Sequence, residues 1–217
     1  MADIEQVSEF KYLGSMLTSR NEMQREILTR IAAGNRCFYS LQYIIKRRGI
    51  SRATKLRVYN SIIRPVAVYG CETWTLTKRQ EQKLLVFENS ILRRITGPVY
   101  DVEEGAWRRR HNQEIRDITK QPLISNYVRS KRLRWGGHVA RMEEDRMPRR
   151  VMEGTLEGRR PVGRPRMRWR DNLMEDLRQM GVEDPQNDWR DIALDRRTWK
   201  GLVGAAMGHQ EAREPPE

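Results

Sequence analysis

Apolar side chains in the first half of the chain recur at helical spacing, apart from one short segment at its start. From Asn21 onward they return every three or four positions, as expected for an amphipathic helix. They are Ile27, Ile31, Phe38, Leu41 and Ile45. The preceding residues 6–18 instead read as two short strands around a turn at Gly14. A hairpin of this size is marginal alone, so we expect it to pack on the following helix.

Helix start and stop signals predict two more helices before residue 98. Ser51 is placed to cap the first of them, and Pro65 is expected to kink or interrupt it. Thr77 and Gln80 form a capping-box pattern at the start of the second. Gly97 and Pro98 then end that helix, because glycine favours the residue after a helix and proline cannot continue one.

The second half of the chain also shows helical spacing, interrupted by one loop. Helices are predicted near residues 112–118, 123–142 and 166–180, with two shorter ones before residue 208. Residues 155–165 are rich in Gly, Pro and Arg and predict a loop. The sequence thus predicts a mainly α fold. We expect a helical bundle with a small β-hairpin in 1–98, a basic helical module in 99–208 and a disordered tail in 209–217.

Composition limits the class of protein. The chain has 217 residues, of which 38% are hydrophobic and 33% charged, with a formal net charge of +13. This is enough apolar material for a core, and the charge is typical of proteins that bind polyanions. The two cysteines and the lack of a long apolar run indicate a reduced, intracellular compartment without a membrane anchor. We expect the nucleus rather than the cytoplasm.

The positive charge is concentrated in residues 129–170, which hold 14 Lys or Arg and five Asp or Glu. Such a segment attracts polyanions, so the sequence predicts contact with RNA or DNA phosphates. The candidate contacts are Arg129, Lys131, Arg132, Arg134, Arg149, Arg150, Arg159, Arg160, Arg164, Arg166, Arg168, Trp169 and Arg170. A solvated basic surface without a ligand is the simpler alternative.

Two tryptophans lie among these arginines. Trp169 follows the Gly/Pro/Arg loop, so we predict that it stacks on an unpaired base. Trp135 falls at helical spacing with Val128 and Val139, so we predict that it packs in the core. For Trp107, as for most tryptophans, core packing is also the expected role.

Other chemistry has weaker support in the sequence. The cysteines and histidines lack zinc-site spacing, so no metal or cofactor site is expected. They are Cys37, Cys71, His111, His138 and His209. A metal-dependent nuclease needs clustered carboxylates and a base. Asp101, Glu103 and Glu104, with Arg110 and His111, offer such a group, although an exposed loop explains them equally well.

Two DNA-reading alternatives remain open at this stage. The helices predicted before and after Pro122 have the outline of a helix-turn-helix, although an ordinary helix pair has the same outline. Gly163, Arg164 and Pro165 form the centre of an AT-hook-like segment. Val162 stands where that motif has an arginine, which favours a phosphate-binding loop instead.

Several motifs resemble non-LTR (LINE-type) retrotransposon reverse transcriptases. They are FKYLGS at 10–15, YNSIIRPVAVYGCETW at 59–74, LRRITG at 92–97, LRWGGHVARM at 133–142 and GRPRMRW at 163–169. The resemblance implies the helical thumb and C-terminal region downstream of the catalytic palm. The catalytic Asp-Asp pair of that family is not found in this sequence, so the resemblance implies no catalytic residues here. It also implies that Met1 starts a truncated element.

In the parent polymerase these regions would grip the template and product duplex or the target DNA. We therefore expect a nucleic-acid-binding fragment without polymerase activity of its own, whose partners are RNA or DNA and a separate palm-bearing chain. The alternative, from a different functional class, is a decayed or domesticated helical protein-interaction module.

Overall fold

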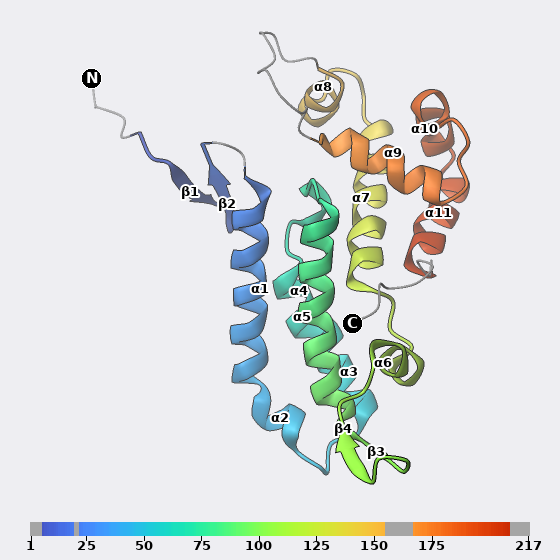
Figure 1. The fold of residues 1–217 in the computed structure, drawn as a ribbon. Coiled ribbons are helices and arrows are strands. Elements are labelled where there is room, and N and C mark those ends of the chain that lie inside the picture. Colours follow the sequence, from blue (N-terminus) through green and yellow to red (C-terminus); the bar gives the residue numbers. More distant parts are fainter. Residues whose placement is uncertain (1–5, 20–21, 155–166, 209–217) are drawn as a thin grey trace. The chain divides into compact units, whose positions relative to one another are not determined.

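The computed structural model describes residues 6–19, 22–154 and 167–208, and the chain forms two compact units. Unit 1 contains Met1–Gly70 and Lys78–Gln121, and unit 2 contains Cys71–Thr77 and Pro122–Glu217. Both units are built mainly from helices, and an antiparallel hairpin comes first in the chain (Figure 1). The prediction of a mainly α fold with a small N-terminal hairpin is therefore confirmed. The expected boundary after residue 98 falls inside unit 1.

The N-terminal hairpin joins β1 (Glu9–Tyr12) and β2 (Ser15–Thr18), with Tyr12 opposite Ser15. Its turn requires a left-handed backbone at Gly14, where φ is 86°. The hairpin is attached to the first helix through Glu26, whose carboxylate accepts a hydrogen bond of 2.6 Å from the Met16 backbone N–H. The expected packing of this hairpin on the following helix is thus observed.

Three helical segments form the body of unit 1. They are α1 (Met23–Ser40) with the short α2 (Gln42–Lys46), a middle segment of α3 (Arg52–Val58), a π-helical turn (Tyr59–Ile63) and α4 (Arg64–Ala67), and α5 (Lys78–Thr96). The middle segment runs opposite to α1 and α5 (Figure 1). Ser51 caps α3 as predicted, because its hydroxyl accepts from the Thr54 N–H at 3.1 Å. The interruption expected at Pro65 is the π-helical turn just before it.

A buried polar network joins the helices of unit 1. The Tyr59 hydroxyl donates to Glu88 at 2.8 Å, and Arg116 donates to the second oxygen of that carboxylate at 3.0 Å. Burial, followed by the charge of Glu88, raises the pKa of Tyr59 well above its ordinary value. The phenol is therefore neutral and acts as a hydrogen-bond donor that satisfies a fully buried carboxylate.

Unit 1 ends with a second hairpin and a short helix. The hairpin pairs β3 (Val99–Asp101) with β4 (Ala106–Arg108), and α6 (Asn112–Thr119) follows it. Tyr100 lies opposite Trp107 in the strand pair. The sequence did not predict this hairpin, because strands of three residues show too little alternation to be recognised.

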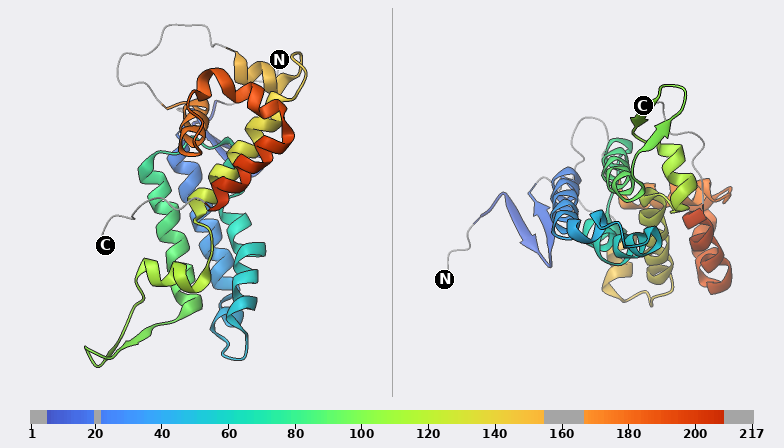
Figure 2. Two further views of the ribbon diagram at one scale, coloured as in Figure 1. Left: turned by 90° about the vertical axis from the view of Figure 1, so that its right-hand side faces the viewer. Right: turned by 90° about the horizontal axis from the view of Figure 1, so that it is seen from below.

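The described residues of unit 2 form five helices and one 3₁₀ turn. They are α7 (Ile124–Ala140), α8 (Met147–Glu153), α9 (Trp169–Gln179), α10 (Pro185–Leu194), α11 (Arg196–Gly208) and the turn Cys71–Thr73. Helices α7 and α11 lie side by side (Figure 2). Their close approach requires glycine at residue 137, where an added Cβ would lie 2.1 Å from the Trp199 ring nitrogen. That nitrogen donates to the Leu133 carbonyl at 2.9 Å, which fixes α11 on α7.

Candidate nucleic-acid interface

Two arginines of the predicted interface lie in the interior of unit 2. Arg129 is 3% exposed and Arg132 is 2% exposed. Both donate to the carboxylate of Asp176 on α9, Arg129 at 3.1 Å and Arg132 through a shorter contact. A buried guanidinium that already holds a carboxylate cannot reach a phosphate. We therefore remove both residues from the predicted interface, where sequence charge had placed them.

The Asp176 cluster is a structural ion pair. Burial raises the pKa of Asp176, while the charges and hydrogen bonds of Arg132 and Arg129 oppose that shift. The two buried guanidinium groups favour the charged form of this carboxylate, whereas burial disfavours it. Taking one partner from such a pair leaves a buried charge without compensation, so the cluster holds α7 and α9 together.

The remaining predicted cations differ in their surroundings. Lys131 lies over the Tyr127 ring, with its ammonium 5.3 Å from the ring centroid. Arg149 has an ion pair with Glu144 at 3.3 Å and another with Glu153 at 3.2 Å. The exposed residues are Arg134, Arg150, Arg168 and Arg170. Lying outside the described residues are Arg159, Arg160, Arg164 and Arg166, together with the AT-hook-like segment.

Trp169 is a packing residue of unit 2. Its indole N–H donates to the Glu72 carbonyl at 2.7 Å, and its half-buried ring packs against the core cluster that contains Leu133 and Leu173. The ring thus fixes the 3₁₀ turn to α9, and the predicted base-stacking role is corrected to a structural one. Trp135 is half-buried, with its ring 5.6 Å from that of His138.

Helix α7 is a core helix rather than a groove-reading one. Its buried positions include Val128, Leu133, Gly137 and Val139 in addition to the two buried arginines. A recognition helix must expose one face to base edges. The described contacts of α7 therefore favour the ordinary helical packing that the sequence left open.

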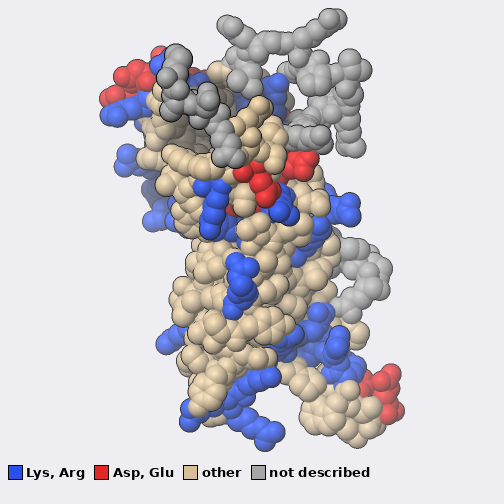
Figure 3. Space-filling view, turned by 90° about the vertical axis from the view of Figure 1, so that its left-hand side faces the viewer, with Lys and Arg blue, Asp and Glu red and all other residues tan. Residues whose placement is uncertain are grey.

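A different basic surface is found in unit 1. Residues 27–70 contain nine Lys or Arg and no Asp or Glu. A count of cations alone does not single out this run, because its distinguishing feature is the absence of acidic residues. Figure 3 shows Lys and Arg side chains gathered at the lower end of the molecule, where α2 lies. The exposed cations of the run between the end of α2 and the start of α3 are Lys46, Arg47, Arg48 and Arg52.

We define the corner surface by the exposed side chains at the ends of α1 and α2 and at the start of α3. It consists of Tyr39, Tyr43, Lys46, Arg47, Arg48 and Arg52. In the part of the chain that the structure describes, none of its four cations has an ion-pair partner. Free cations at this density attract phosphates and release counterions when they bind them.

Both tyrosines of the corner surface contact an arginine. Arg47 donates to the Tyr43 hydroxyl at 2.8 Å, with its guanidinium carbon 5.6 Å from the ring centroid. Arg94 on α5 lies 5.3 Å from the centroid of Tyr39 and 5.2 Å from that of Phe38. The corner therefore combines unpaired cations with aromatic rings, the combination that irregular nucleic acid needs.

The carboxylates considered for a nuclease are placed by the second hairpin. Arg108 donates to Asp101 at 2.8 Å and to both oxygens of Glu114, at 2.9 and 3.0 Å. These bonds lower the pKa of Asp101 and bring that of Glu114 to about 2. Glu103 and Glu104 lie exposed in the turn. Because an arginine occupies Asp101, these residues do not form an open metal site, and no group of His, Cys, Asp or Glu in the described residues could hold a metal ion.

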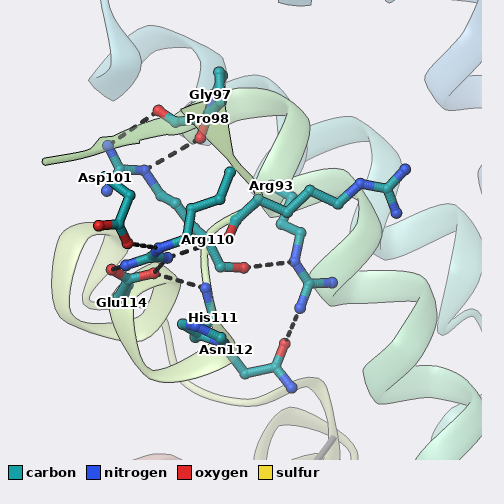
Figure 4. Close-up of polar contacts among 10 residues, drawn as sticks. Arg93, Gly97, Pro98, Asp101, Arg110, His111, Asn112 and Glu114 are labelled. Atoms are coloured by element: carbon teal, nitrogen blue, oxygen red, sulfur yellow. Dashed lines mark hydrogen bonds and ion pairs between the residues drawn. The ribbon is translucent and has the colours of Figure 1, made fainter. Parts of the chain in front are cut away.

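The cations near this hairpin are also structural, as Figure 4 shows. Arg93 donates to the Arg110 carbonyl at 2.9 Å and to the Asn112 side chain at 2.5 Å. Arg110 donates to the Gly97 carbonyl at 3.2 Å. Their bonds fix the base of the hairpin against α5, while Trp107 on its outer face is 70% exposed. The expectation that Trp107 is a core anchor is therefore wrong.

The described helices include none with the length and apolar character needed to cross a membrane.

Comparison with known proteins gives one informative similarity. The chain resembles a Caenorhabditis elegans protein named as an uncharacterized transposon-derived protein. The two are 27% identical over 202 residues, which cover 92% of this chain and 71% of the C. elegans protein. No protein-family model matches the chain, and no solved structure matches it significantly. The similarity supports a transposon-related origin for this chain.

Proposed function

We propose that this chain is a nucleic-acid-binding segment of a retrotransposon protein and that the corner surface is its main contact. The observation that carries the proposal is the acid-free run 27–70, in which four of the six exposed cations lie at that corner without ion-pair partners in the described structure. Binding through cations and phosphates alone carries little sequence preference. The ligand is therefore RNA or DNA of varied sequence.

We further propose that the retrotransposon is of the non-LTR type. The transposon-derived relative supports the broader origin. The motifs at 10–15, 59–74 and 133–142 support the narrower one through their resemblance to the thumb and C-terminal region of those reverse transcriptases. In such a polymerase this segment would hold nucleic acid while a palm carries out the chemistry.

Fluorescence anisotropy of the full chain with labelled RNA and DNA tests the binding. Affinity should fall log-linearly with salt, by about 100-fold between about 50 and 200 mM if each of the four corner cations neutralises one phosphate. Scrambling the sequence of the probe should change the affinity little. Absence of binding at the lowest salt, or binding that does not depend on salt, would contradict the proposal and favour a protein-interaction module.

Primer extension tests the assignment to a non-catalytic segment. Two-metal phosphoryl transfer needs paired carboxylates, and the sequence contains no adjacent Asp pair. The purified chain should therefore incorporate no nucleotide in the presence of Mg²⁺ or Mn²⁺. Template-dependent incorporation above a no-protein control would overturn this assignment.

A further inference from the structure

We infer that the corner surface binds unpaired nucleobases by stacking them on Tyr39 and Tyr43. This inference rests on the proposed function and names the class of nucleic acid that the surface takes. The corner surface thereby discriminates single strands, loops or ends from fully paired duplex. The shared chemistry is a base with a free face, which RNA and DNA both provide.

Tyr43 presents most of its ring to solvent, with 73% of the residue exposed. The hydrogen bond from Arg47 to its hydroxyl restrains the ring, and the same guanidinium places a positive charge beside it. A nucleotide that stacks on a tyrosine brings a phosphate close to the ring. The ring and Arg47 therefore match the two parts of one nucleotide.

Tyr39 has the same arrangement with a partner from another helix. It is 54% exposed, and the edge of its ring contacts buried Phe38, with ring centroids 5.5 Å apart. Arg94 reaches across from α5 to the same ring and lies 3.4 Å from its hydroxyl. Because Phe38 and Arg94 already restrain Tyr39, little side-chain entropy remains to be lost on binding.

The surrounding charge favours nucleic acid over a protein partner. Covering these tyrosines with an apolar protein surface would remove water from Lys46, Arg48 and Arg52, which have no carboxylate partner among the described residues. Burying unpaired charges is costly. A nucleic acid instead brings its own phosphates to these cations while its bases cover the rings.

A paired duplex does not fit the tyrosines equally well. Its bases are stacked on one another, so a surface ring finds no free base face except at an end. Phosphate contacts alone would favour the duplex, because its charge density is higher. Any preference for the unpaired form must therefore come from the rings, which makes it separable by mutation.

The test compares the wild-type chain with the Tyr39→Ala/Tyr43→Ala variant on oligo-U, oligo-dT and a mixed-sequence duplex of about 12 nucleotides per strand, close to the site size of single-strand binders. The variant should bind both single strands about 10- to 100-fold more weakly and the duplex within about twofold, since each stacked base contributes about a factor of ten. The salt slope should stay the same, because no cation is removed. Equal losses on single strand and duplex, or loss on RNA alone, would overturn the inference.

Three controls separate stacking from other effects. An abasic strand of the same length keeps its phosphates, so wild type and variant should bind it equally. Tyr39→Phe/Tyr43→Phe keeps both rings and should retain most of the affinity. Tyr12→Ala removes a tyrosine of similar exposure from β1 and should leave binding unchanged. A circular dichroism melt confirms that each variant is folded.

The outcomes also distinguish the two proposals. If the wild type binds none of the probes, the proposed function and this inference both fail. If it binds every probe and the double alanine variant binds as the wild type does, the proposed function stands and the stacking inference fails.

Discussion

Arginine has opposite surroundings in α7 and at the corner surface, although both segments are strongly basic in sequence. In α7, Arg129 and Arg132 are buried and share the carboxylate of Asp176. At the corner, Arg48 and Arg52 are exposed and have no ion-pair partner among the described residues. The difference shows that the charge of a segment predicts a binding surface only where acidic partners are missing. A run of cations without acidic residues is therefore a better indicator of a binding surface than a run with a high density of cations.

The largest effect is expected from breaking the buried cluster of α7. Arg132→Ala leaves Asp176 and Arg129 buried with an incomplete set of contacts, which costs about 3–5 kcal/mol when one partner of a buried pair is lost. Chemical denaturation would measure the change in the free energy of unfolding. Arg134→Ala, on the exposed side of the same helix, should cost less than about 0.5 kcal/mol. Similar losses for both variants would show that Arg132 has no special structural role.

A second prediction tests whether α7 is a core helix. Gly137→Ala places a methyl group within 2.1 Å of the Trp199 ring nitrogen, so α11 or the ring must move. Overpacking of this kind costs about 1–3 kcal/mol. At Gly201 on α11 an added Cβ meets no atom within 4 Å. Gly201→Ala should therefore leave the melting temperature unchanged or raise it, because alanine favours helix by about 1 kcal/mol over glycine. Equal melting temperatures for the two variants would contradict close packing at residue 137.

A third prediction compares the exposed cations of both regions directly. Arg47→Ala/Arg48→Ala/Arg52→Ala should weaken nucleic-acid binding about tenfold or more and lower the salt slope by about 0.9 per lost phosphate contact. The matched variant Arg134→Ala/Arg150→Ala/Arg170→Ala removes the same charge from unit 2 and should have a clearly smaller effect. Anisotropy at several salt concentrations measures both quantities. The reverse order of effects would move the interface to the C-terminal half.

The smallest effect concerns Arg108, whose carboxylate partners Asp101 and Glu114 are half-buried. Hydrogen bonds from Arg108 bring the pKa of Glu114 to about 2 from an ordinary value of 4.5. A lowered carboxyl pKa contributes stability that is fully present above about pH 4.5 and is lost as the pH falls toward about 2. Protection of the backbone N–H groups in the β3–β4 hairpin against hydrogen exchange, corrected for the intrinsic exchange rate at each pH, should therefore fall over that range.

Two substitutions check this assignment. Glu114→Gln should remove most of the acid-sensitive step, whereas Glu104→Gln, an exposed turn residue, should leave it in place. An unchanged acid response in the Glu114 variant would assign the step to another carboxylate.

The sequence was informative about local structure and less so about exposure. Helical spacing located α1, α5 and α9, and Ser51 located the start of α3 because a cap acts within a few residues. The hairpin formed by β3 and β4 was missed, since its three-residue strands are held by contacts of Arg108 rather than by an alternating pattern. The interface was misplaced because burial of Arg129 depends on Asp176, which lies 47 positions further along the chain.

The sharing of Asp176 by two arginines also constrains how this protein can change over time. A substitution that removes the carboxylate leaves Arg129 and Arg132 without their buried partner at once. Loss of either arginine alone would leave the Asp176 carboxylate with one of its two partners. Related chains should therefore replace these three positions together, and apolar residues of similar volume would be acceptable as a set. Such concerted replacement would appear in an alignment as covariation between α7 and α9.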